Sequence, residues 1–468
     1  MSSVRSDSIV EFFEPMPTSI IGESALIVSF TGWLRSTDDS FPDLTFTIDK
    51  GAVQSITLGE PIPGTLRLEN TSEIVKWIGF SGLIHLPKAA IGFIHNVCIS
   101  IAGADYSDEY YYNIERQQPD GPVLPNTDSV IAICMAVYNP PKDVFARQIS
   151  SIIDQDRSDW ICIINDDGSN PESVELILQT VENDSRFYYF RNSSNLGFYS
   201  NFETALARVP DHISYIALAD QDDYWYPHKL STLSKKMREG CQLVYSDLKI
   251  VDESGIPQSE SYWGYRLNEY KNLKLMLVAN TVTGAAAMFR RDLLETILPF
   301  PAKIGDSFHD HWLACAALAR GKIGYIDSPL YDYYQYGRSI IGHCDFSVDN
   351  SKPFPWRWYQ LLNPINMRNL MRRFIGSSFA IYWFECRRIS LICANLKARR
   401  INDANNSLTL FKGGQSSIWK LLILHFSVSK IKRITNHAEL RLARAYLVYI
   451  SSRFLYRIGI KQKPRINQ

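Results

Sequence analysis

The sequence predicts an α/β domain built on a parallel-dominated sheet, with a β-rich region before it and a basic helical region after it. Three observations lead to this fold class. Strand-like and helix-like segments alternate through the middle of the chain, short alternating apolar segments fill its first quarter, and lysine and arginine concentrate in its last quarter. We therefore expect four parts: a β-sandwich-like domain over 1–116, a linker over 117–128, the α/β domain over 129–349 and a basic helical region over 350–468.

The charge is balanced over the whole chain but not along it. The 468 residues carry 49 Lys and Arg, 49 Asp and Glu and 46% hydrophobic residues, as ordinary globular proteins do. After Asn350, 22 Lys and Arg stand against three acids, a net charge of +19, which leaves −19 for the preceding residues. This asymmetry predicts that the basic part meets an anionic surface. The alternative is a basic helical region that lies against the acidic body.

The cysteines and the N-terminus indicate a reduced, cytosolic setting. The eight cysteines include no CxxC pair, and Cys134 and Cys162 lie inside apolar strand-like runs. The first residues, "MSSVRSDSIVEFFEP", have acids where a signal peptide has an apolar core. Because no uninterrupted run of about 18 apolar residues occurs, we expect no membrane-spanning helix.

The first region has the pattern of short strands. In "LTFTID", Leu44, Phe46 and Ile48 alternate with polar residues, which is the period of a strand with one buried face. Similar segments are "ALIVSF", "QSITLG", "TLRLE", "VKWIGF" and "VCISIAG". Their short spacing predicts an antiparallel β-sandwich, which fits either a sugar-binding module or, slightly better, a packing or oligomerisation domain. The three prolines of "ERQQPDGPVLPNTDS" indicate a linker.

Strands and helices alternate from Ser129 onward. The strand-like runs are "VIAICMAVY", "WICIIN", "FYYFRN" and "ISYIALAD", with helix-like segments between them. This order predicts right-handed crossovers and a parallel sheet, whose ligands bind outside the carboxyl ends of the strands. The polar loops "YNPP", "NDDGSN", "NSSN" and "DQDD" follow the four strands in turn, so we expect them to line one rim.

The motifs of this region carry a family resemblance. In order they are "MAVYNPP", "SIIDQ", "INDDGSN", "NLGFYSNFETAL", "LADQDDYWYPHKL", "TGAAAMFRRDLL", "HDHWLA" and "PLYDYYQYG". Each is weak alone, but the ordered set resembles the family 2 glycosyltransferases of the GT-A fold. More narrowly, it is similar to the rhamnosyltransferase-like bacterial subgroup that builds surface polysaccharides such as O-antigen or capsule. The resemblance covers about Ser129 to His343, nearly half of the chain.

The acidic loop "DQDD" is the candidate metal site. A nucleotide-sugar donor carries a diphosphate that leaves with negative charge, and Mg²⁺ or Mn²⁺ held by carboxylates offsets that charge. We expect Asp220 and Asp222 to be the metal ligands, with Asp222 the more direct one by the resemblance. Asp220 and Asp223 then act partly through water or ribose. The structural alternative is an acidic turn in which Asp223 caps the next helix.

The nucleotide is expected to bind on the neighbouring loops. By the resemblance, Asp166 accepts the pyrimidine ring N–H, with Asp167 as second candidate, and Gly168 permits the tight turn beside the base. The alternative is a plain Asp-Gly turn. Further candidates for nucleotide or structural contacts are Tyr138, Asn139, Asn195, Gly197 and Asn201.

The stretch "DSFHDHWLACAAL" contains the candidate catalytic base. Asp310 is expected at the N-terminus of a helix, where the resemblance places a carboxylate that takes the acceptor proton. His309 and His311 are rivals, and simple helix capping is the structural alternative. Thr283 and Gly284 are expected to floor the acceptor pocket, and Trp312 to wall it.

One position departs from the family pattern. Members of the subgroup have a histidine associated with the diphosphate where this chain has Tyr336. Either Arg338 or His343 then neutralises the diphosphate, or the diphosphate is held less tightly.

The tail suggests contact with a membrane surface. In "SSIWKLLILHFSVSKIKRI", apolar residues recur at helical spacing between lysines and arginines, as in helices of the membrane interface. The alternative is a helical bundle packed on the catalytic domain. No nucleic-acid-binding module is recognised, so we expect no nucleic-acid partner.

Together these features predict a metal-dependent, inverting glycosyltransferase that moves a hexose or deoxyhexose from a UDP- or dTDP-sugar donor to a lipid-linked glycan. We expect it to be cytoplasmic and peripheral on the inner face of the cell membrane. One alternative is a sugar-phosphate nucleotidyltransferase, although "YNPP" lacks the Gly-rich phosphate loop. The other is a non-catalytic carbohydrate-binding protein with a decayed transferase domain.

Overall fold

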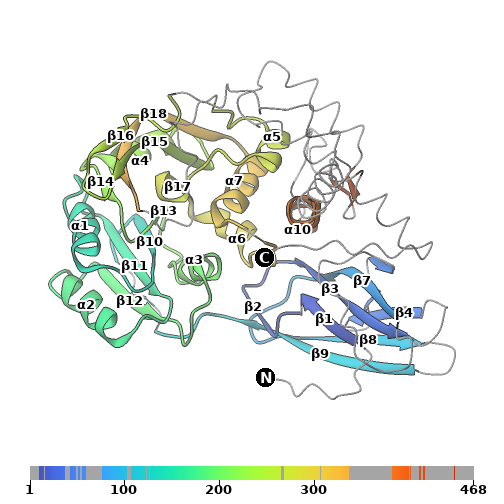
Figure 1. Cartoon of the computed structure of the whole chain (residues 1–468). Helices are drawn as coiled ribbons and strands as arrows, with labels where there is room; N and C mark the ends of the chain where they lie inside the picture. Colours follow the sequence, from blue (N-terminus) through green and yellow to red (C-terminus); the bar gives the residue numbers. More distant parts are fainter. Residues whose placement is uncertain are drawn as a thin grey trace, which may run out of the picture.

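A computed structural model of the chain shows two β-sheets of the N-terminal region, a larger α/β domain and a C-terminal helix between them (Figure 1). It describes residues 10–14, 16–36, 43–48, 51–52, 55–58, 76–102, 107–122, 124–125, 127–264, 268–305, 307–336, 382–399, 401, 411–412, 415–416 and 447. The candidate residues Arg338 and His343, the segment "TLRLE" and most of the basic tail lie outside these residues.

The N-terminal strands form two sheets that share one hydrophobic cluster. The first sheet has the order β1 (Val10–Glu14), β3 (Leu26–Ser36), β7 (Lys76–Leu86) and β6 (Ser55–Leu58). The second has the order β2 (Ser19–Ile21), β9 (Ser107–Gln117), β8 (Ile94–Ala102), β4 (Asp43–Ile48) and β5 (Gly51–Ala52). Phe30 and Phe80 of the first sheet belong to the same cluster as Ile99 and Ile114 of the second. The assignment of 1–116 as a separate sandwich-like domain stays a prediction.

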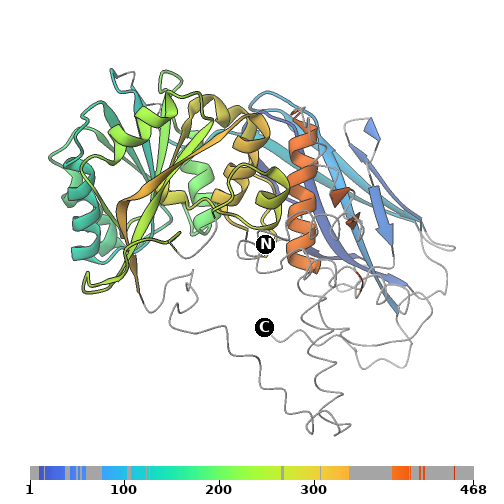
Figure 2. The same cartoon turned by 90° about the horizontal axis from the view of Figure 1, so that it is seen from above.

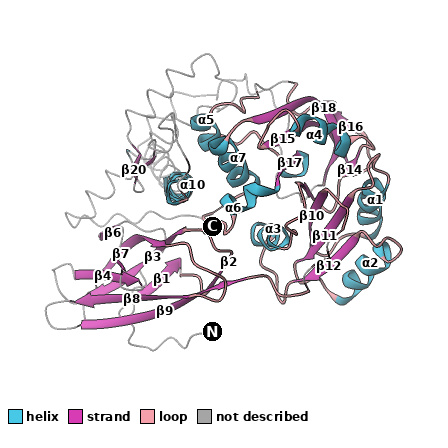
Figure 3. Cartoon of the chain, turned by 180° about the vertical axis from the view of Figure 1, so that it is seen from behind, coloured by secondary structure: helices cyan, strands magenta, loops and turns pink. Residues whose placement is uncertain are grey.

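The α/β domain is built on one large sheet. Its strand order is β12 (Phe187–Arg191), β11 (Trp160–Asp166), β10 (Ile131–Val137), β13 (Tyr215–Ala219), β17 (Ala287–Arg290), β15 (Leu243–Asp252), β18 (Ile323–Gln335) and β14 (Tyr224–Trp225), and β16 (Pro257–Ser259) pairs with β15. Helix α3 (Phe198–Ala207) covers one face, and α1 (Lys142–Ile153) and α2 (Pro171–Val181) cover the other (Figures 1 and 3).

The sheet is mixed rather than parallel-dominated, which corrects the prediction. Strands β10 to β13 are parallel as expected, but β17 runs antiparallel to both β13 and β15. The connection from β15 to β17 includes β16, the helix α5 (Leu273–Val278) and the 3-10 turn η1 (Gly284–Ala286), so it is long enough for either strand direction, and packing decides the direction of β17. The predicted α/β class is confirmed.

Strand register brings the polar loops to one rim. Val137, the last residue of β10, pairs with Asp166, and Asp166 pairs with Arg191 at the end of β12. Met135 pairs with Ala219, the last residue of β13. The loops that follow β10, β11, β12 and β13 therefore leave the sheet side by side.

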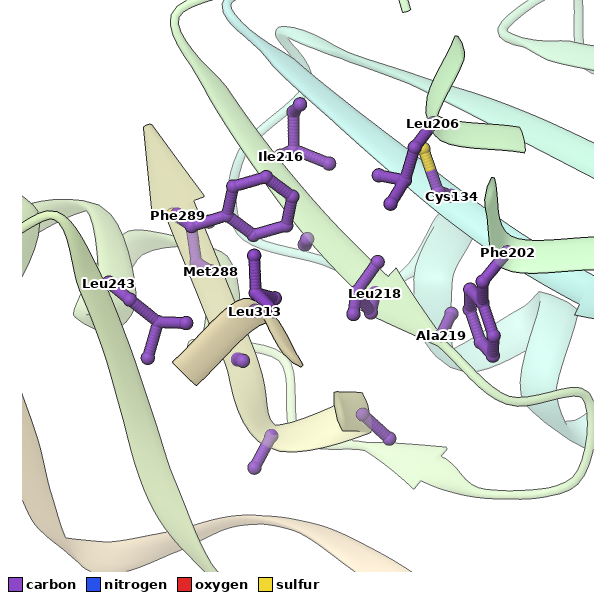
Figure 4. Packing of buried hydrophobic residues seen from close by; sticks show 14 of the residues in the cluster. Cys134, Phe202, Leu206, Ile216, Leu218, Ala219, Leu243, Met288, Phe289 and Leu313 are labelled. Atoms are coloured by element: carbon purple, nitrogen blue, oxygen red, sulfur yellow. The ribbon is translucent and has the colours of Figure 1, made fainter. Parts of the chain in front are cut away.

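The remaining helices of the α/β domain pack in the core and support the loops at this edge of the sheet. They are α4 (Lys229–Met237), α5 (Leu273–Val278), η2 (Arg291–Leu293), α6 (Leu294–Ile297) and α7 (His309–Arg320). Leu313 of α7 and Phe202 of α3 belong to the same core cluster as Leu218 of β13 and Phe289 of β17 (Figure 4). The helices that carry the candidate residues are therefore anchored in the core.

The C-terminal helix α10 (Arg387–Ala398), which continues a π-helical turn (Tyr382–Cys386), stands between the N-terminal sheets and the α/β domain (Figure 2). Its Leu391 packs with Ile27 of β3 and Ile304 of the α/β domain. The buried Asn395 accepts the backbone N–H of Ile27 at 2.9 Å and donates to the Ile27 carbonyl at 3.3 Å. This side chain therefore satisfies the backbone groups of a strand that lies 368 residues away in sequence.

The other face of α10 packs in the hydrophobic core of the α/β domain. Cys386, Ile389, Ile392, Cys393 and Leu396 are members of the same hydrophobic cluster as the central sheet. Arg399, directly after the helix, donates to the carbonyl of Ala25 at 3.0 Å and to the carbonyls of Thr296 and Pro299.

This position of α10 agrees, for this helix alone, with the alternative of a helical region packed on the body, because the helix buries its apolar side against protein. It does not bear on the membrane prediction for the tail that lies outside the described residues. No described helix combines the length and the apolar character needed to span a bilayer.

Candidate active site

The loop after β13 places three carboxylates close together. Asp220 and Asp222 are half-buried, whereas Asp223 is only 1% exposed. Burial, together with the charges of Asp222 and Asp310, raises the pKa of Asp220 to about 7, and burial raises that of Asp222 to about 6. Neither carboxylate oxygen of Asp223 has a hydrogen-bond partner among the described residues. Asp223 does not cap the next helix, because α4 begins at Lys229 with His228 at its N-cap.

A buried lysine beneath this loop was missed by the sequence analysis. Lys229 is fully buried, donates to the carbonyl of Ala285 at 2.6 Å, and has its ammonium 3.8 Å from the ring centroid of Trp225. Its positive charge lowers the pKa of both Asp220 and Asp223. A cation in the first turn of a helix is unfavourable by itself, so the position of Lys229 at the start of α4 was the one sequence signal that this lysine has a special role.

The candidate base Asp310 lies in the first turn of α7. Burial raises its pKa to about 7, while the backbone N–H groups of His311 and Gly284 and the charge of Arg388 on α10 lower it. Phe308, not Asp310, is the N-cap residue, so Asp310 is not simply a cap. Its charge in turn raises the pKa of Asp220, which means that the two carboxylates lie close enough to interact.

The two rival histidines are poor bases in this environment. His309 stacks on Phe202 with ring centroids 3.9 Å apart, and burial lowers its pKa to about 3. His311 lies with Nε2 2.8 Å from the carbonyl of Met276, and burial lowers its pKa to about 4. Because a general base works best with a pKa near the working pH, Asp310 is the better candidate of the three.

Gly284 lies against both His309 and Asp310. A Cβ at this position would lie 2.6 Å from Nε2 of His309 and 3.6 Å from Cβ of Asp310. Thr283, half-buried, is the residue before η1, so the expected acceptor floor does adjoin the candidate base.

We expect Gly284→Ala to lower transfer by about 10–100-fold, because the first turn of α7 must shift to admit the methyl group and the base is then misplaced. Steady-state transfer rates at saturating donor measure the loss. The donor should still stabilise the variant against heat, because the donor site is unchanged. Gly264→Ala is the matched control, since its nearest new neighbour is Oγ of Ser261 at 3.3 Å and its backbone is ordinary. Equal rates for the two variants would show that Gly284 does not position Asp310.

Trp312 does not wall an acceptor site, contrary to the prediction. Its side chain is 1% exposed, and its indole N–H donates to the carbonyl of Ile297 at 2.9 Å. It follows Asp310 by two residues, which is about half a turn, so it points from α7 into the core on a different side from Asp310.

The nucleotide-loop carboxylates are engaged inside the protein. Asp167 accepts from the side chain of Asn192 at 2.9 Å and from the backbone N–H groups of Leu196 and Gly197, each at 2.8 Å, so it holds the loop before α3. Asp166 is fully buried and accepts from Ser169 and, at 2.7 Å, from the hydroxyl of Tyr189.

The guanidinium of Arg191 lies 3.5 Å from the same carboxylate of Asp166. A direct contact between Asp166 and a base therefore requires Tyr189 or Arg191 to move aside. Neither residue was singled out from the sequence.

The loop after β10 is tied to the acidic loop. The backbone N–H of Tyr138 donates to the side chain of Gln221 at 2.8 Å, and Tyr138 is 47% exposed, so its ring is free to stack on a base. Asn139 has a φ of +42° and donates its N–H to Oγ of Ser169 at 2.8 Å. The hydrogen bond of Gln221 to Tyr138, which joins the two loops, could not be seen in the sequence.

The third loop is mainly structural. Asn201 is buried and bonded to the side chains of Asn165 and Asn192, at 2.6 and 3.0 Å. Gly197 has a φ of +81° and donates to Asp167, and Asn195 is exposed beside it. Of the three candidate residues in this loop, Asn195 is the exposed one.

A positive charge lies beside Tyr336, the position that departs from the family pattern. Arg147 of α1 donates to the hydroxyl of Tyr336 at 2.9 Å and to the carbonyl of Asp222 at 2.6 Å. Its guanidinium lies 3.4 Å from the ring centroid of Tyr334, and its charge lowers the pKa of Asp222. The sequence analysis did not identify Arg147, because α1 is distant in sequence from both partners.

Comparisons with known proteins agree with this geometry. Residues 132–298 match the model of Glycosyl transferase family 2. The chain contains a family 2 glycosyltransferase domain. An uncharacterized glycosyltransferase of Methanocaldococcus jannaschii is 26% identical over 192 residues, which are 40% of this chain and 65% of that protein.

A GalNAc(5)-diNAcBac-PP-undecaprenol beta-1,3-glucosyltransferase of Campylobacter jejuni is 27% identical to this chain over 150 residues, which are 32% of this chain and 48% of that protein. The chain thus spans about half to two thirds of the length of these relatives. The crystal structure of S. aureus TarS 1–349 overlaps with a TM-score of 0.39 at 16% identity, covering 69% of this chain and 91% of that one. A likeness of this degree adds nothing about ligands.

Proposed function

We propose that the protein is a metal-dependent, inverting glycosyltransferase that moves a sugar from a UDP- or dTDP-sugar to a lipid-linked glycan. The observation that carries this proposal is the pairing of Asp310 on α7 with Asp220 on the loop after β13, since the charges of the two carboxylates interact. One carboxylate can serve the acceptor hydroxyl while the acidic loop serves the leaving diphosphate.

The donor set of the acidic loop fits a divalent cation. Asp220 and Asp222 offer hard carboxylate oxygens whose raised pKa values record crowding and burial that a cation would relieve. Among the described residues no group of three or more His, Cys, Asp or Glu side chains forms a ready metal cage, so diphosphate oxygens and water would complete the coordination. When bound, Mg²⁺ or Mn²⁺ would offset the charge of the departing diphosphate.

Asp310 supplies the base of the proposed reaction. In its ionised form the carboxylate would accept the proton of the acceptor hydroxyl as that oxygen attacks the anomeric carbon from the side opposite the diphosphate. The face of α7 that carries Trp312 and Leu313 is buried, which keeps the helix and its first turn fixed. Preorganisation of this kind is what a positioned base requires.

The proposed acceptor and location follow from a relative and from the charge of the tail. The Campylobacter relative is named for an undecaprenol-linked substrate, and a lipid-linked acceptor of this chain would be met at the inner face of the cell membrane. The basic tail, with its excess of Lys and Arg, is the part of the chain suited to an anionic leaflet.

Asp310→Asn tests the proposal. We expect turnover to fall by about 10²–10⁴-fold, because the amide keeps the shape of the carboxylate but cannot accept the proton. Released nucleoside diphosphate is measured across a panel of UDP- and dTDP-sugars. Since the base must be ionised, wild-type turnover should rise with pH through the pKa of Asp310, at or below about 7. The variant should lose the part of this rise that belongs to Asp310, and the rise that remains should follow the ionisation of Asp220 and Asp222.

The control is Asp327→Asn, an exposed carboxylate near the hydroxyl of Tyr325. A loss of less than tenfold in Asp310→Asn, or a larger loss in His309→Ala, would remove Asp310 from the role. Sugar-phosphate activation without any acceptor would instead identify a nucleotidyltransferase.

A further inference from the structure

An aromatic pair lies next to the candidate base. Phe198, the first residue of α3, stacks on Phe308, the N-cap residue of α7, with ring centroids 5.7 Å apart and planes at 29°. Both rings are half-buried, unlike the neighbouring Phe202, which is 2% exposed and lies in the core. Leu196, just before the pair, is 48% exposed. The pair therefore presents part of its surface to solvent.

The position of this pair relative to Asp310 is fixed by His309. Its ring stacks on Phe202 and meets Phe198 edge-on, with centroids 6.2 Å apart. His309 is 9% exposed, and neither ring nitrogen has a hydrogen-bond partner among the described residues. Nε2 of His309 faces Gly284, where a Cβ would lie only 2.6 Å away, so the imidazole is packed between Phe202 and η1 and holds the first turn of α7 beside the aromatic pair.

A lysine completes the cluster. The ammonium of Lys303 lies 5.3 Å from the ring centroid of Phe198, and the position of a Cβ on Gly197 would be 3.9 Å from it. Lys303 is exposed and forms no ion pair with a described carboxylate, although residues 1–349 carry a net charge of −19. A cation over an aromatic face without an acidic partner is available to an anionic ligand.

We propose that Phe198, Phe308 and Lys303 form the acceptor subsite, in which the ring pair stacks on the acceptor sugar and the lysine binds a phosphate attached to that sugar. The apolar C–H face of a sugar ring suits an aromatic surface, and lysine binds phosphate as a point charge. The acceptor class is then a glycosyl phosphate, as at the head of a lipid-linked glycan. This inference rests on the proposed function, because it describes the second substrate of the same site. It also assigns the aromatic wall that Trp312 does not provide.

Kinetics with paired acceptors test this subsite. Decyl glycosyl phosphates and the matching decyl glycosides, which carry the same sugars without the phosphate, are compared with the wild type, Lys303→Met and Lys303→Arg. For the phosphates we expect Lys303→Met to raise the acceptor KM by about tenfold or more, with the donor KM unchanged and Lys303→Arg close to wild type. For the neutral glycosides the three proteins should have equal KM values. Lys271→Met is the control, since Lys271 is an exposed lysine whose ammonium lies 5.4 Å from the ring of Tyr270.

The aromatic surface is tested separately. Phe198→Leu keeps an apolar side chain at the start of α3 but loses the flat face, so it should raise the acceptor KM for both acceptor types, whereas Phe198→Tyr should not. An unchanged melting temperature shows that the fold is retained. If Phe198→Leu does not fold, Lys303→Met alone decides the proposal.

The outcomes separate this inference from the proposed function. The subsite would be overturned if Lys303→Met turns over and its KM for the glycosyl phosphate acceptor equals that of the wild type. If no acceptor turns over, thermal stabilisation by decyl glycosyl phosphate is measured directly. Stabilisation of the wild type but not of Lys303→Met would support the subsite while the proposed function fails, and absence of stabilisation in both would overturn the subsite too.

Discussion

Replacing Asp222 with Ala is expected to abolish sugar transfer and to leave the fold intact. The substitution removes one of two carboxylates proposed to hold the divalent cation, so the leaving diphosphate loses its counter-charge. The carbonyl of Asp222, not its carboxylate, receives the hydrogen bond from Arg147, so the loop keeps this contact in the variant. Nucleoside diphosphate release in Mg²⁺ and in Mn²⁺ measures the effect, and Asp220→Ala should be severely impaired as well.

The stability of Asp222→Ala should move in the opposite direction from its activity. The folded-state pKa of Asp222 is raised to about 6, so its ionised form opposes folding at pH values above its unfolded pKa. Removing the carboxylate should therefore leave the melting temperature at pH 7 unchanged or higher. Near wild-type rates in Asp222→Ala, or full activity of the native protein in excess EDTA, would show that the site works without a metal.

Ending the chain at residue 381 is expected to prevent folding of the catalytic domain. This truncation deletes α10, whose Ile389, Ile392, Cys393 and Leu396 are at most 4% exposed in the core cluster. Loss of each large buried side chain typically costs about 2–5 kcal/mol, and whole domains are stable by only about 5–15 kcal/mol. Denaturant unfolding followed by near-ultraviolet circular dichroism measures the result.

Point substitutions in α10 test its contribution to stability one residue at a time. Leu396→Ala should lower the free energy of unfolding by about 2–5 kcal/mol, whereas Lys397→Ala, an exposed neighbour on the same helix, should change it by less than about 0.5 kcal/mol. A cooperative, wild-type-like transition in the chain ending at residue 381 would contradict the assignment of α10 to the core. A chain ending at residue 401 retains α10, so loss of its binding to anionic vesicles would report on the tail alone.

The rim of the sheet could be predicted from the sequence because its signals are local. Each polar loop follows an apolar strand directly, and parallel strands bring their carboxyl ends together, so Asp220, Asp222 and the "NDDGSN" loop could be placed without coordinates. The parallel-dominated sheet was wrong beyond β13, because strand direction there depends on a turn, η1, whose path is set by tertiary packing.

The charges that surround the carboxylates could not be predicted. Arg147 of α1 and Arg388 of α10 act on carboxylates that are distant in sequence. Lys229 of α4 follows Asp220 and Asp223 closely in sequence, but the sequence does not show that its side chain is buried beneath their loop. Trp312 was misplaced because its proximity to Asp310 in sequence was taken for proximity to the ligand, whereas two residues, about half a turn of helix, bring it to the core side of α7. The apolar face of α10 illustrates a general ambiguity, since an amphipathic basic helix fits a membrane surface and a protein surface equally well.

The late position of α10 in the chain bears on how the protein is made. The last strand of the catalytic sheet ends at Gln335, and the contacts of Arg399 follow 64 residues later. At about 5–20 residues per second, the ribosome needs about 3–13 s to supply this stretch. During that interval the core residues that pack on α10 have no partner from this helix, so the domain cannot complete its hydrophobic core until α10 has been made. Premature stop codons anywhere before α10 should therefore yield aggregation-prone chains rather than shortened enzymes, and a chaperone that shields apolar surface should raise the yield of the intact protein.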